Sequence, residues 1–430
     1  MPAAATGTVP RAVGVYLGVL QFAFALCWVV YAAYLPQLLR QLGFEGQEQR
    51  IVPWVLAMDQ LIFLLTDWLV GTWSDQAAQV LHRLSLWMLG GTLVSGGAFA
   101  LLPQVAAGTS LGLFLALTVL WAITSAALRA PPLTLLGRYV SRPAQPALVA
   151  LMALGLGLCN ALAPYLALQL KTIDPRWPFA LSALVLVAVT LGMHRAEAAL
   201  ARARATPADE PSASMPRSAA APAPARVPDA SPEPAAAPPR PGAAALCLLA
   251  ACALAALAFQ AHVFLISGPL YLRHLDGAAQ LPQWLPLFWV GFNLALWPAS
   301  RWARALGAPR VLALGLALAT AALALVQIAA GLSLLATAQL LAGAAWAVVM
   351  CAAFCSVLAL GHTGREGMLN GALQSVLALG ALTRLLVVAL VTPVAAQLLA
   401  WSGLVVLLFA AAALLLLWGL KRLPGWPAPA

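Results

Sequence analysis

The chain has 430 residues, of which 63% are hydrophobic and only 8% are charged, and its net charge is +10. A soluble domain carries roughly a quarter charged residues, so this chain has too little polar surface to face water. The composition excludes a soluble or secreted enzyme, a disordered chain and a coiled coil, and it leaves a polytopic α-helical membrane protein.

Apolar runs long enough to cross a bilayer recur along the chain. A helix of about 20 residues spans the hydrocarbon core, which is roughly 30 Å thick. The turns near Gly331 and Thr392–Pro393 are the least marked, so eleven spans are the alternative to the twelve that we predict. The predicted spans are 14–38, 51–72, 84–102, 110–129, 146–170, 177–193, 243–270, 282–299, 310–330, 333–360, 367–390 and 394–420.

The start of the chain fits a retained first span. The segment Met1–Arg11 is short, and the apolar run after it is much longer than the core of a signal peptide. We therefore expect no cleaved leader.

The Lys and Arg residues predict the orientation, because they stay on the cytoplasmic side. With the N-terminus inside, the predicted cytoplasmic segments hold seventeen Lys and Arg residues and the outer segments hold five, while Arg384 lies within a span. This asymmetry predicts a multi-pass protein of the cytoplasmic (inner) membrane with both termini inside. It also explains the net charge as a topology signal, so we expect no nucleic-acid partner.

A proline-rich segment divides the chain into halves. Residues 205–241 contain eleven prolines among Ala, Ser and scattered charges. Such a stretch cannot bury a core and is typical of a disordered linker. The predicted organisation is a cytoplasmic N-terminus (1–13), an N-terminal six-helix bundle (14–193), a disordered cytoplasmic linker (194–242), a C-terminal six-helix bundle (243–420) and a cytoplasmic tail (421–430).

The two halves resemble each other where their first spans end. Leu39-Arg40-Gln41-Leu42-Gly43 follows the first span, and Leu272-Arg273-His274-Leu275-Asp276 follows the seventh. Two six-helix halves joined by a cytoplasmic linker resemble the layout of major facilitator transporters. That resemblance implies a major facilitator fold, with the substrate site between the halves near the midplane of the bilayer.

The loop after the second span carries a second resemblance. Gly71-Thr72-Trp73-Ser74-Asp75-Gln76, with His82-Arg83 further on, resembles the signature loop of the facilitators. The resemblance implies that Gly71, Asp75 and Arg83 form an inner gate that holds one half against the other.

Three segments resemble a narrower group. Gly18-Val19-Leu20-Gln21-Phe22, Leu128-Arg129-Ala130-Pro131 and Gly157-Leu158-Cys159-Asn160-Ala161-Leu162 are similar to stretches of the sucrose-transporter family. That family belongs to the glycoside-pentoside-hexuronide:cation symporters, whose melibiose-type members carry an aspartate shortly before a glycine, as in Asp67-Trp68-Leu69-Val70-Gly71. Sodium-using members place a second aspartate near the position of Arg129, so the resemblance implies coupling to protons.

Four ionisable residues are predicted at membrane depth, where a charge costs a few kcal/mol and is a functional candidate. They are Asp59, close to the midplane, Asp67, Arg129 and Arg384. Our hypothesis pairs Asp67 with Arg129, and Asp59 with Arg384 or with a proton, so that moving an arginine lets a carboxylate bind or release a proton. The alternative is a set of static ion pairs that hold helices in register.

Uncharged polar residues are candidates for the cavity wall. Asn370 and Gln374 share a helical face with Arg384. Hydrogen bonding between helices is the alternative for each of these residues, and core packing is the alternative for the tryptophans. Further candidates are Gln21, Asn160, Gln260, His262 and Asn293, with Trp28, Trp121 and Trp346 as stacking platforms.

Catalytic and metal-binding patterns are lacking in the sequence. The six cysteines fall inside apolar runs and predict neither disulfides nor a metal site. There is no phosphate-binding glycine loop with a lysine and no Gly-x-Ser-x-Gly segment. We therefore expect no enzyme activity and no cofactor.

These observations predict a monomeric secondary active transporter in the lipid bilayer that works by alternating access. We expect proton-coupled symport of a sugar, glycoside or similar polar small molecule. One alternative is a proton-antiport exporter of drugs or metabolites, in which Asp59 senses a cation. A second alternative is a non-transporting relative that acts as an assembly factor or sensor.

Overall fold

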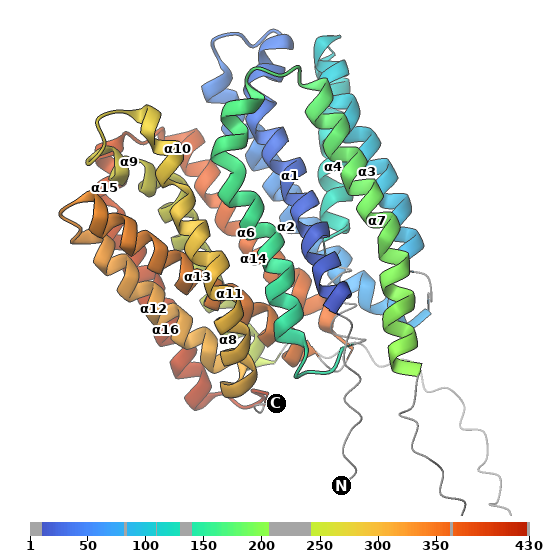
Figure 1. Ribbon diagram of the computed structural model, residues 1–430, viewed down its shortest axis with the longest axis vertical. Helices are drawn as coiled ribbons and strands as arrows, with labels where there is room; N and C mark the ends of the chain where they lie inside the picture. Colours follow the sequence, from blue (N-terminus) through green and yellow to red (C-terminus); the bar gives the residue numbers. More distant parts are fainter. Residues whose placement is uncertain are drawn as a thin grey trace, which may run out of the picture.

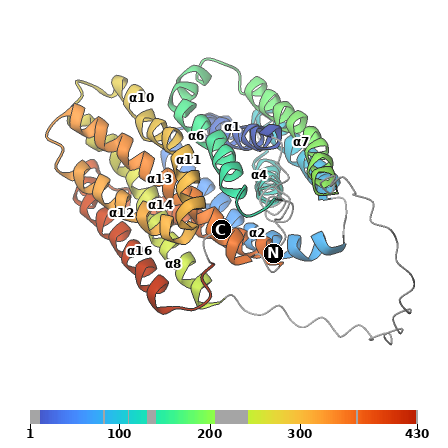
Figure 2. The ribbon, with the colours of Figure 1, turned by 60° about the horizontal axis from the view of Figure 1, so that its bottom comes forward.

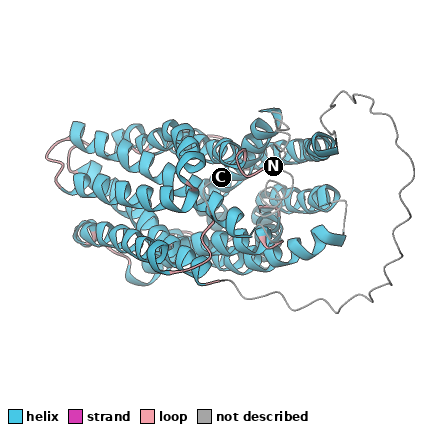
Figure 3. Cartoon of the chain, turned by 90° about the horizontal axis from the view of Figure 1, so that it is seen from below, coloured by secondary structure: helices cyan, strands magenta, loops and turns pink. Residues whose placement is uncertain are grey.

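A computed structural model describes residues 11–80, 84–108, 110–129, 140–205, 242–361 and 364–427. Within these ranges every regular element is helical, and no strand occurs (Figure 3). Predicted site residue Arg83 lies outside the described residues.

The described helices fall into two groups of six spans, which lie on the right and left of Figure 1. The first group consists of α1 (Arg11–Gln41), α2 (Glu48–Val80), α3 (Leu84–Ala107), α4 (Leu111–Ala127), α6 (Gln145–Leu170) and α7 (Arg176–Ala205). The second begins with a broken span, which consists of α8 (Ala243–Ala261), the π-helix η1 (His262–Ile266) and α9 (Ser267–Leu272). After two short helices, η2 (Ala278–Gln280) and α10 (Leu281–Trp284), it continues with α11 (Pro286–Leu306), α12 (Ala308–Gln327), α13 (Leu332–Gly361), α14 (Glu366–Val391) and the pair α15 (Ala395–Ala400) and α16 (Ser402–Arg422).

The helices have the length and composition of membrane spans. Nine helices or joined helices in the described chain are long and apolar enough to cross a membrane. Helix α4 and the part of α7 up to Gly192 are shorter apolar helices. Helix α11, with 21 residues, carries Arg301 and Arg304 near its end. Together they make twelve spans in two groups of six, which confirms the predicted all-α fold class and span count.

Helix α7 extends past residue 194, where the linker was predicted to begin. Helix α7 continues to Ala205, beyond its apolar part. The residues after the apolar part are mostly Ala, Glu and Arg, which have high helix propensity, so the helix extends out of the membrane-spanning region. The remainder of the predicted linker that precedes Gly242 lies outside the described residues.

The helices within each half approach closely at small residues. This is usual in a membrane, because the hydrophobic effect does not drive helices together in lipid and small residues allow the close packing that does. In the first half, a Cβ on Gly155 of α6 would collide with the backbone of Gly18 on α1. In the second half, a Cβ on Gly343 of α13 would collide with the backbone of Phe288 on α11. These contacts fix the helix positions from which the central side chains project.

The two halves meet along two helix pairs, α2 with α14 and α6 with α11 (Figure 2). Helix α1 begins and α16 ends at the same end of the bundle, which we call the termini face (Figure 1). Because the spans alternate in direction, α2 ends and α14 begins at the termini face too. A space enclosed by the two helix pairs holds the candidate site.

Candidate functional site

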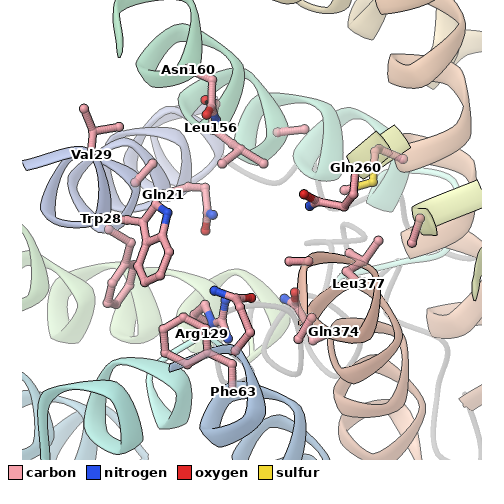
Figure 4. A pocket seen from close by; sticks show the side chains of 18 of the residues that line it. Gln21, Trp28, Val29, Phe63, Arg129, Leu156, Asn160, Gln260, Gln374 and Leu377 are labelled. Atoms are coloured by element: carbon pink, nitrogen blue, oxygen red, sulfur yellow. The ribbon is translucent and has the colours of Figure 1, made fainter. Parts of the chain in front are cut away.

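A cavity of about 310 Å³ lies between the halves. Most of its wall is apolar or aromatic, with a few polar side chains among the apolar ones, as is typical of small-molecule sites. Figure 4 shows polar groups from both halves pointing into the same space. The polar lining residues are Gln21, Gln60, Ser125, Arg129, Asn160, Gln260, Gln374 and Arg384.

Arg129 enters the cavity wall as half of an ion pair. Its Nη2 lies 2.8 Å from Oδ2 of Asp67, a fully buried carboxylate on α2 that is not part of the wall. The guanidinium carbon lies 4.3 Å from the centre of the Phe63 ring, which gives a cation–π contact. The predicted pairing of Asp67 with Arg129 is therefore present, and it neutralises this arginine.

Arg384 enters the wall from α14 without such a partner. Its Nε donates to Oε1 of Gln260 at 3.0 Å, and its guanidinium carbon lies 4.7 Å from the centre of the Phe264 ring. Within the described part of the chain Arg384 forms no ion pair and no carboxylate lines the cavity. The cavity thus carries one positive charge that its own wall does not balance.

Asp59 lies behind the cavity wall, inside the first half. Asp59 was predicted to pair with Arg384 or with a proton; it forms no ion pair with Arg384, since it is fully buried and does not line the cavity. Neither carboxyl oxygen has a hydrogen-bond partner among the described residues. The hydroxyl of Tyr31 lies beside the carboxyl. A charged carboxylate is very costly in such surroundings, so this arrangement suits a protonated carboxyl.

Amide side chains provide further polar contacts. Gln21, Asn160 and Gln374 line the cavity as predicted (Figure 4), and Asn160 also donates from Nδ2 to the carbonyl oxygen of Leu156 at 2.9 Å. The prediction that Asn370 faces the cavity is wrong: it is fully buried, with no hydrogen-bond partner among the described residues.

His262 belongs to a separate buried network in the second half. Its Nε2 lies 3.0 Å from Oε1 of Gln339, and Ser267 Oγ donates to its carbonyl oxygen at 2.9 Å. His262 begins the π-helix that interrupts this span, and it does not line the cavity. This geometry fits a hydrogen-bonded core histidine and not the position in the cavity wall that was predicted for it.

At the termini face, α2 binds the first turn of α14. Asp75 accepts hydrogen bonds from the backbone N–H groups of Gly367 to Oδ1 and Met368 to Oδ2, at 2.7 and 2.8 Å. A carboxylate in this position satisfies free amides and interacts favourably with the helix dipole. Burial, together with nearby Glu366, raises the pKa of Asp75 to about 6, although the two amide hydrogen bonds oppose the shift.

Gly71 lies in the same contact. A Cβ on Gly71 would collide with the carbonyl oxygen of Gly367 and lie 2.9 Å from Cα of Gly371. Ser375 Oγ, one turn further along α14, donates to the carbonyl oxygen of Leu64 at 2.7 Å. The two halves are thus in backbone contact at the termini face, at two of the residues predicted to form a gate.

Several wall residues were missed by the sequence reasoning. Phe63, Phe259, Phe264 and Trp289 all line the cavity. Aromatic residues within apolar spans are usually core residues, so the sequence offers little to single them out. The available signal is positional, because Phe264 and Phe259 flank the polar residues Gln260 and His262 in an otherwise apolar span.

Comparisons with known proteins agree with this architecture. A crystal structure of the human organic anion transporter MFSD10 (TETRAN) is similar to this chain, with a TM-score of 0.65 and 19% sequence identity over 94% of this chain and 99% of that one. At this identity the similarity shows the fold alone. A search of curated protein sequences gave no match. A family model described as Major Facilitator Superfamily matches residues 17–383. The chain therefore belongs to the Major Facilitator Superfamily and is a multi-pass membrane protein and secondary transporter, not an enzyme.

Proposed function

We propose that this transporter carries a small organic anion through the central cavity by alternating access. The observation that carries the proposal is Arg384, a guanidinium in the wall of a cavity in which no described carboxylate balances it. Water-poor surroundings strengthen electrostatic attraction, and a guanidinium binds carboxylate-like groups through paired hydrogen bonds. An anionic solute would supply the missing negative charge.

The neighbours of Arg384 support this role. Gln260 fixes the guanidinium through Nε, which leaves its terminal nitrogens for a ligand. Arg129 is the less suitable anion contact because Asp67 already neutralises it. The amides of Gln21 and Gln374 add hydrogen-bond donors and acceptors along the same wall.

The coupling ion in this proposal is the proton, and its site is Asp59. This buried carboxyl has no hydrogen-bond partner among the described residues, so it can hold a proton without competition from a cation of the chain. Movement of one proton with one monovalent anion transfers no net charge. Symport would therefore be driven by a pH gradient and not by membrane voltage.

Alternating access would act through the two six-helix bundles, with the termini face as the cytoplasmic side, as the Lys and Arg distribution indicates. The contact of Gly71 and Asp75 with α14 would be the gate that closes this side. We assign the bundles to residues 14–193 and 243–420 within this proposal.

A neutral sugar or glycoside is the second candidate. Five amide side chains line the cavity, and sugars bind through such groups over an aromatic face. The resemblance of the first half to the sucrose-transporter family favours this candidate, whereas the similarity in fold to MFSD10, an organic anion transporter, favours the anion.

Uptake into proteoliposomes separates the candidates. We expect radiolabelled monocarboxylates to accumulate when the lumen is alkaline, and Arg384→Gln to abolish that uptake, with Arg273→Gln, an exposed arginine, as the matched control. Uptake of sugars that survives Arg384→Gln would favour the second candidate. Resistance to cationic drugs on expression, with no uptake of either solute class, would contradict both and indicate the exporter. A chain that moves none of these compounds would indicate the assembly factor or sensor.

A further inference from the structure

Aromatic side chains on opposite walls of the cavity form two stacked pairs. On the first half, Trp28 of α1 and Trp121 of α4 have ring centres 6.1 Å apart and planes 16° from parallel. On the second half, Phe259 of α8 and Trp346 of α13 have ring centres 4.2 Å apart and planes 5° from parallel. All four residues line the cavity, so a molecule bound there lies between two aromatic stacks.

The two stacks occupy corresponding places in the fold. Helices α1 and α4 are the first and fourth spans of the first half, and the helices that carry the second stack are the first and fourth spans of the second half. In each half the residue from the first span is partly exposed, and the tryptophan from the fourth span supports it from behind. Trp121 is 3% exposed and Trp346 is 4% exposed. Each stack therefore offers the cavity one supported ring, Trp28 on one side and Phe259 on the other.

Arg384, whose charge no carboxylate of the wall balances, contacts one of these stacks through Phe264. Arg384 lies over the Phe264 ring, whose centre is 6.1 Å from that of Phe259 in an edge-to-face contact. Gln260, which holds Arg384, follows Phe259 directly in the chain. An anion contact and a flat aromatic platform thus lie side by side on the wall of the second half.

We propose that the natural substrate class is planar aromatic carboxylates, with the carboxylate on Arg384 and the ring against the platforms of Phe259 and Trp28. This inference rests on the proposed function and narrows it. Aromatic pairs prefer offset-stacked or edge-to-face arrangements and gain affinity beyond simple burial of area. The cavity volume of about 310 Å³ is at the small end of the range for ligand pockets, which suits a compact, flat solute.

The test compares acids that differ only in the ring. Purified transporter in proteoliposomes is given benzoate, 2-naphthoate and cyclohexanecarboxylate, with benzamide as a neutral aromatic competitor. We expect benzoate to bind roughly two- to tenfold more tightly than cyclohexanecarboxylate, the range that an aromatic contact provides. We expect 2-naphthoate to be at least as good as benzoate, and benzamide to compete weakly.

Variants of the platforms complete the test. Phe259→Leu should reduce the preference for benzoate over cyclohexanecarboxylate while uptake of the latter continues, and Phe259→Tyr, which keeps the ring, should retain the preference. Trp28→Leu should act in the same direction as Phe259→Leu. Trp418→Leu is the matched control, because this tryptophan is 54% exposed and lies outside the cavity.

The outcomes separate this inference from the proposed function. Equal transport of benzoate and cyclohexanecarboxylate, both lost in Arg384→Gln, would overturn the aromatic preference and leave the anion transporter in place. Absence of transport for every acid would overturn the proposed function itself. Competition by benzamide as strong as that by benzoate would overturn the assignment of the carboxylate to Arg384.

Discussion

Replacing Gly371 with alanine would add a methyl group where α14 touches α2 at the termini face. The new Cβ would collide with the carbonyl oxygen of Asp67 and lie 3.0 Å from Cα of Gly71. Non-bonded carbon atoms are normally about 3.5–4.0 Å apart, so the two helices would have to separate by roughly 0.5–1 Å. Both obstacles are backbone atoms, and no side-chain rotation can relieve the contact.

This separation would also weaken the hydrogen bonds of Asp75. They measure 2.7 and 2.8 Å to the amides of Gly367 and Met368, and an increase of about 1 Å takes them beyond useful length. Overpacking a close contact costs roughly 1–3 kcal/mol. At about 1.4 kcal/mol per factor of ten, the closed arrangement would lose roughly 5- to 150-fold in population against the opened one. The gain in helix propensity from alanine is the same in both arrangements, so it cancels.

Spin labels on exposed residues at the termini face can measure the shift. Cysteines at Ser141 in the first half and Arg301 in the second, in a background without the six buried native cysteines, would report the distance between the halves by pulsed electron paramagnetic resonance. We expect a longer distance and slower transport for Gly371→Ala. Gly97→Ala is the control, because its added Cβ would have no atom within 4 Å apart from the backbone of its own helix. An unchanged distance distribution and unchanged transport in Gly371→Ala would refute the reasoning.

Three further predictions concern the charged residues. Asp67→Asn or Arg129→Gln alone should destabilise the protein by roughly 3–5 kcal/mol, because a buried charge loses its partner, and the double variant should recover much of this in thermal unfolding; additive losses would contradict the pairing. Asp59→Asn should retain exchange of substrate across the membrane but lose accumulation driven by a pH gradient, and accumulation that persists would exclude this proton site. The pKa of Asp75 is raised to about 6 in the closed contact, whereas an aspartate in water has a pKa of about 3.9. Between these two pH values the carboxyl is therefore protonated more often in the closed form than in the open form. Lowering the pH at the termini face from 7 to 5 should therefore favour the short spin-label distance, an effect that Asp75→Asn should remove.

The fold could largely be predicted from the sequence, because each segment that crosses the membrane must be long enough and apolar enough to do so. The predicted run 333–360 differs from α13 by one residue at each end, and the predicted run 146–170 differs from α6 only by one residue at its start. Helix α7 shows where the criterion fails, since an apolar run marks only the part in the hydrocarbon core and not the helical extension to Ala205. The π-helix at His262 has no apolar signature and could not be predicted from the pattern of the run.

Part of the candidate site could be predicted from the sequence. The partnership of Asp67 and Arg129 could be predicted because charges at similar depth in a membrane must find partners. The position of Asp59 could not, since the sequence gives depth along a helix but not the final rotation of that helix about its axis. Asp59 faces Tyr31 within its own half, and Asn370, which shares a face with Gln374, is fully buried.

The proposed proton and solute sites are linked by direct contacts, although they are separate. Asp59 lies beside Tyr31, whose ring centre is 4.7 Å from that of Trp121. Trp121 in turn supports Trp28, the ring that faces the cavity. A solute that presses on Trp28 would therefore act on the surroundings of the Asp59 carboxyl through Tyr31, which Trp28 also contacts directly, with ring centres 5.8 Å apart. Packed interiors respond to such pressure by changing between discrete arrangements, so coupling between the proton and the solute requires neither a shared site nor a long pathway.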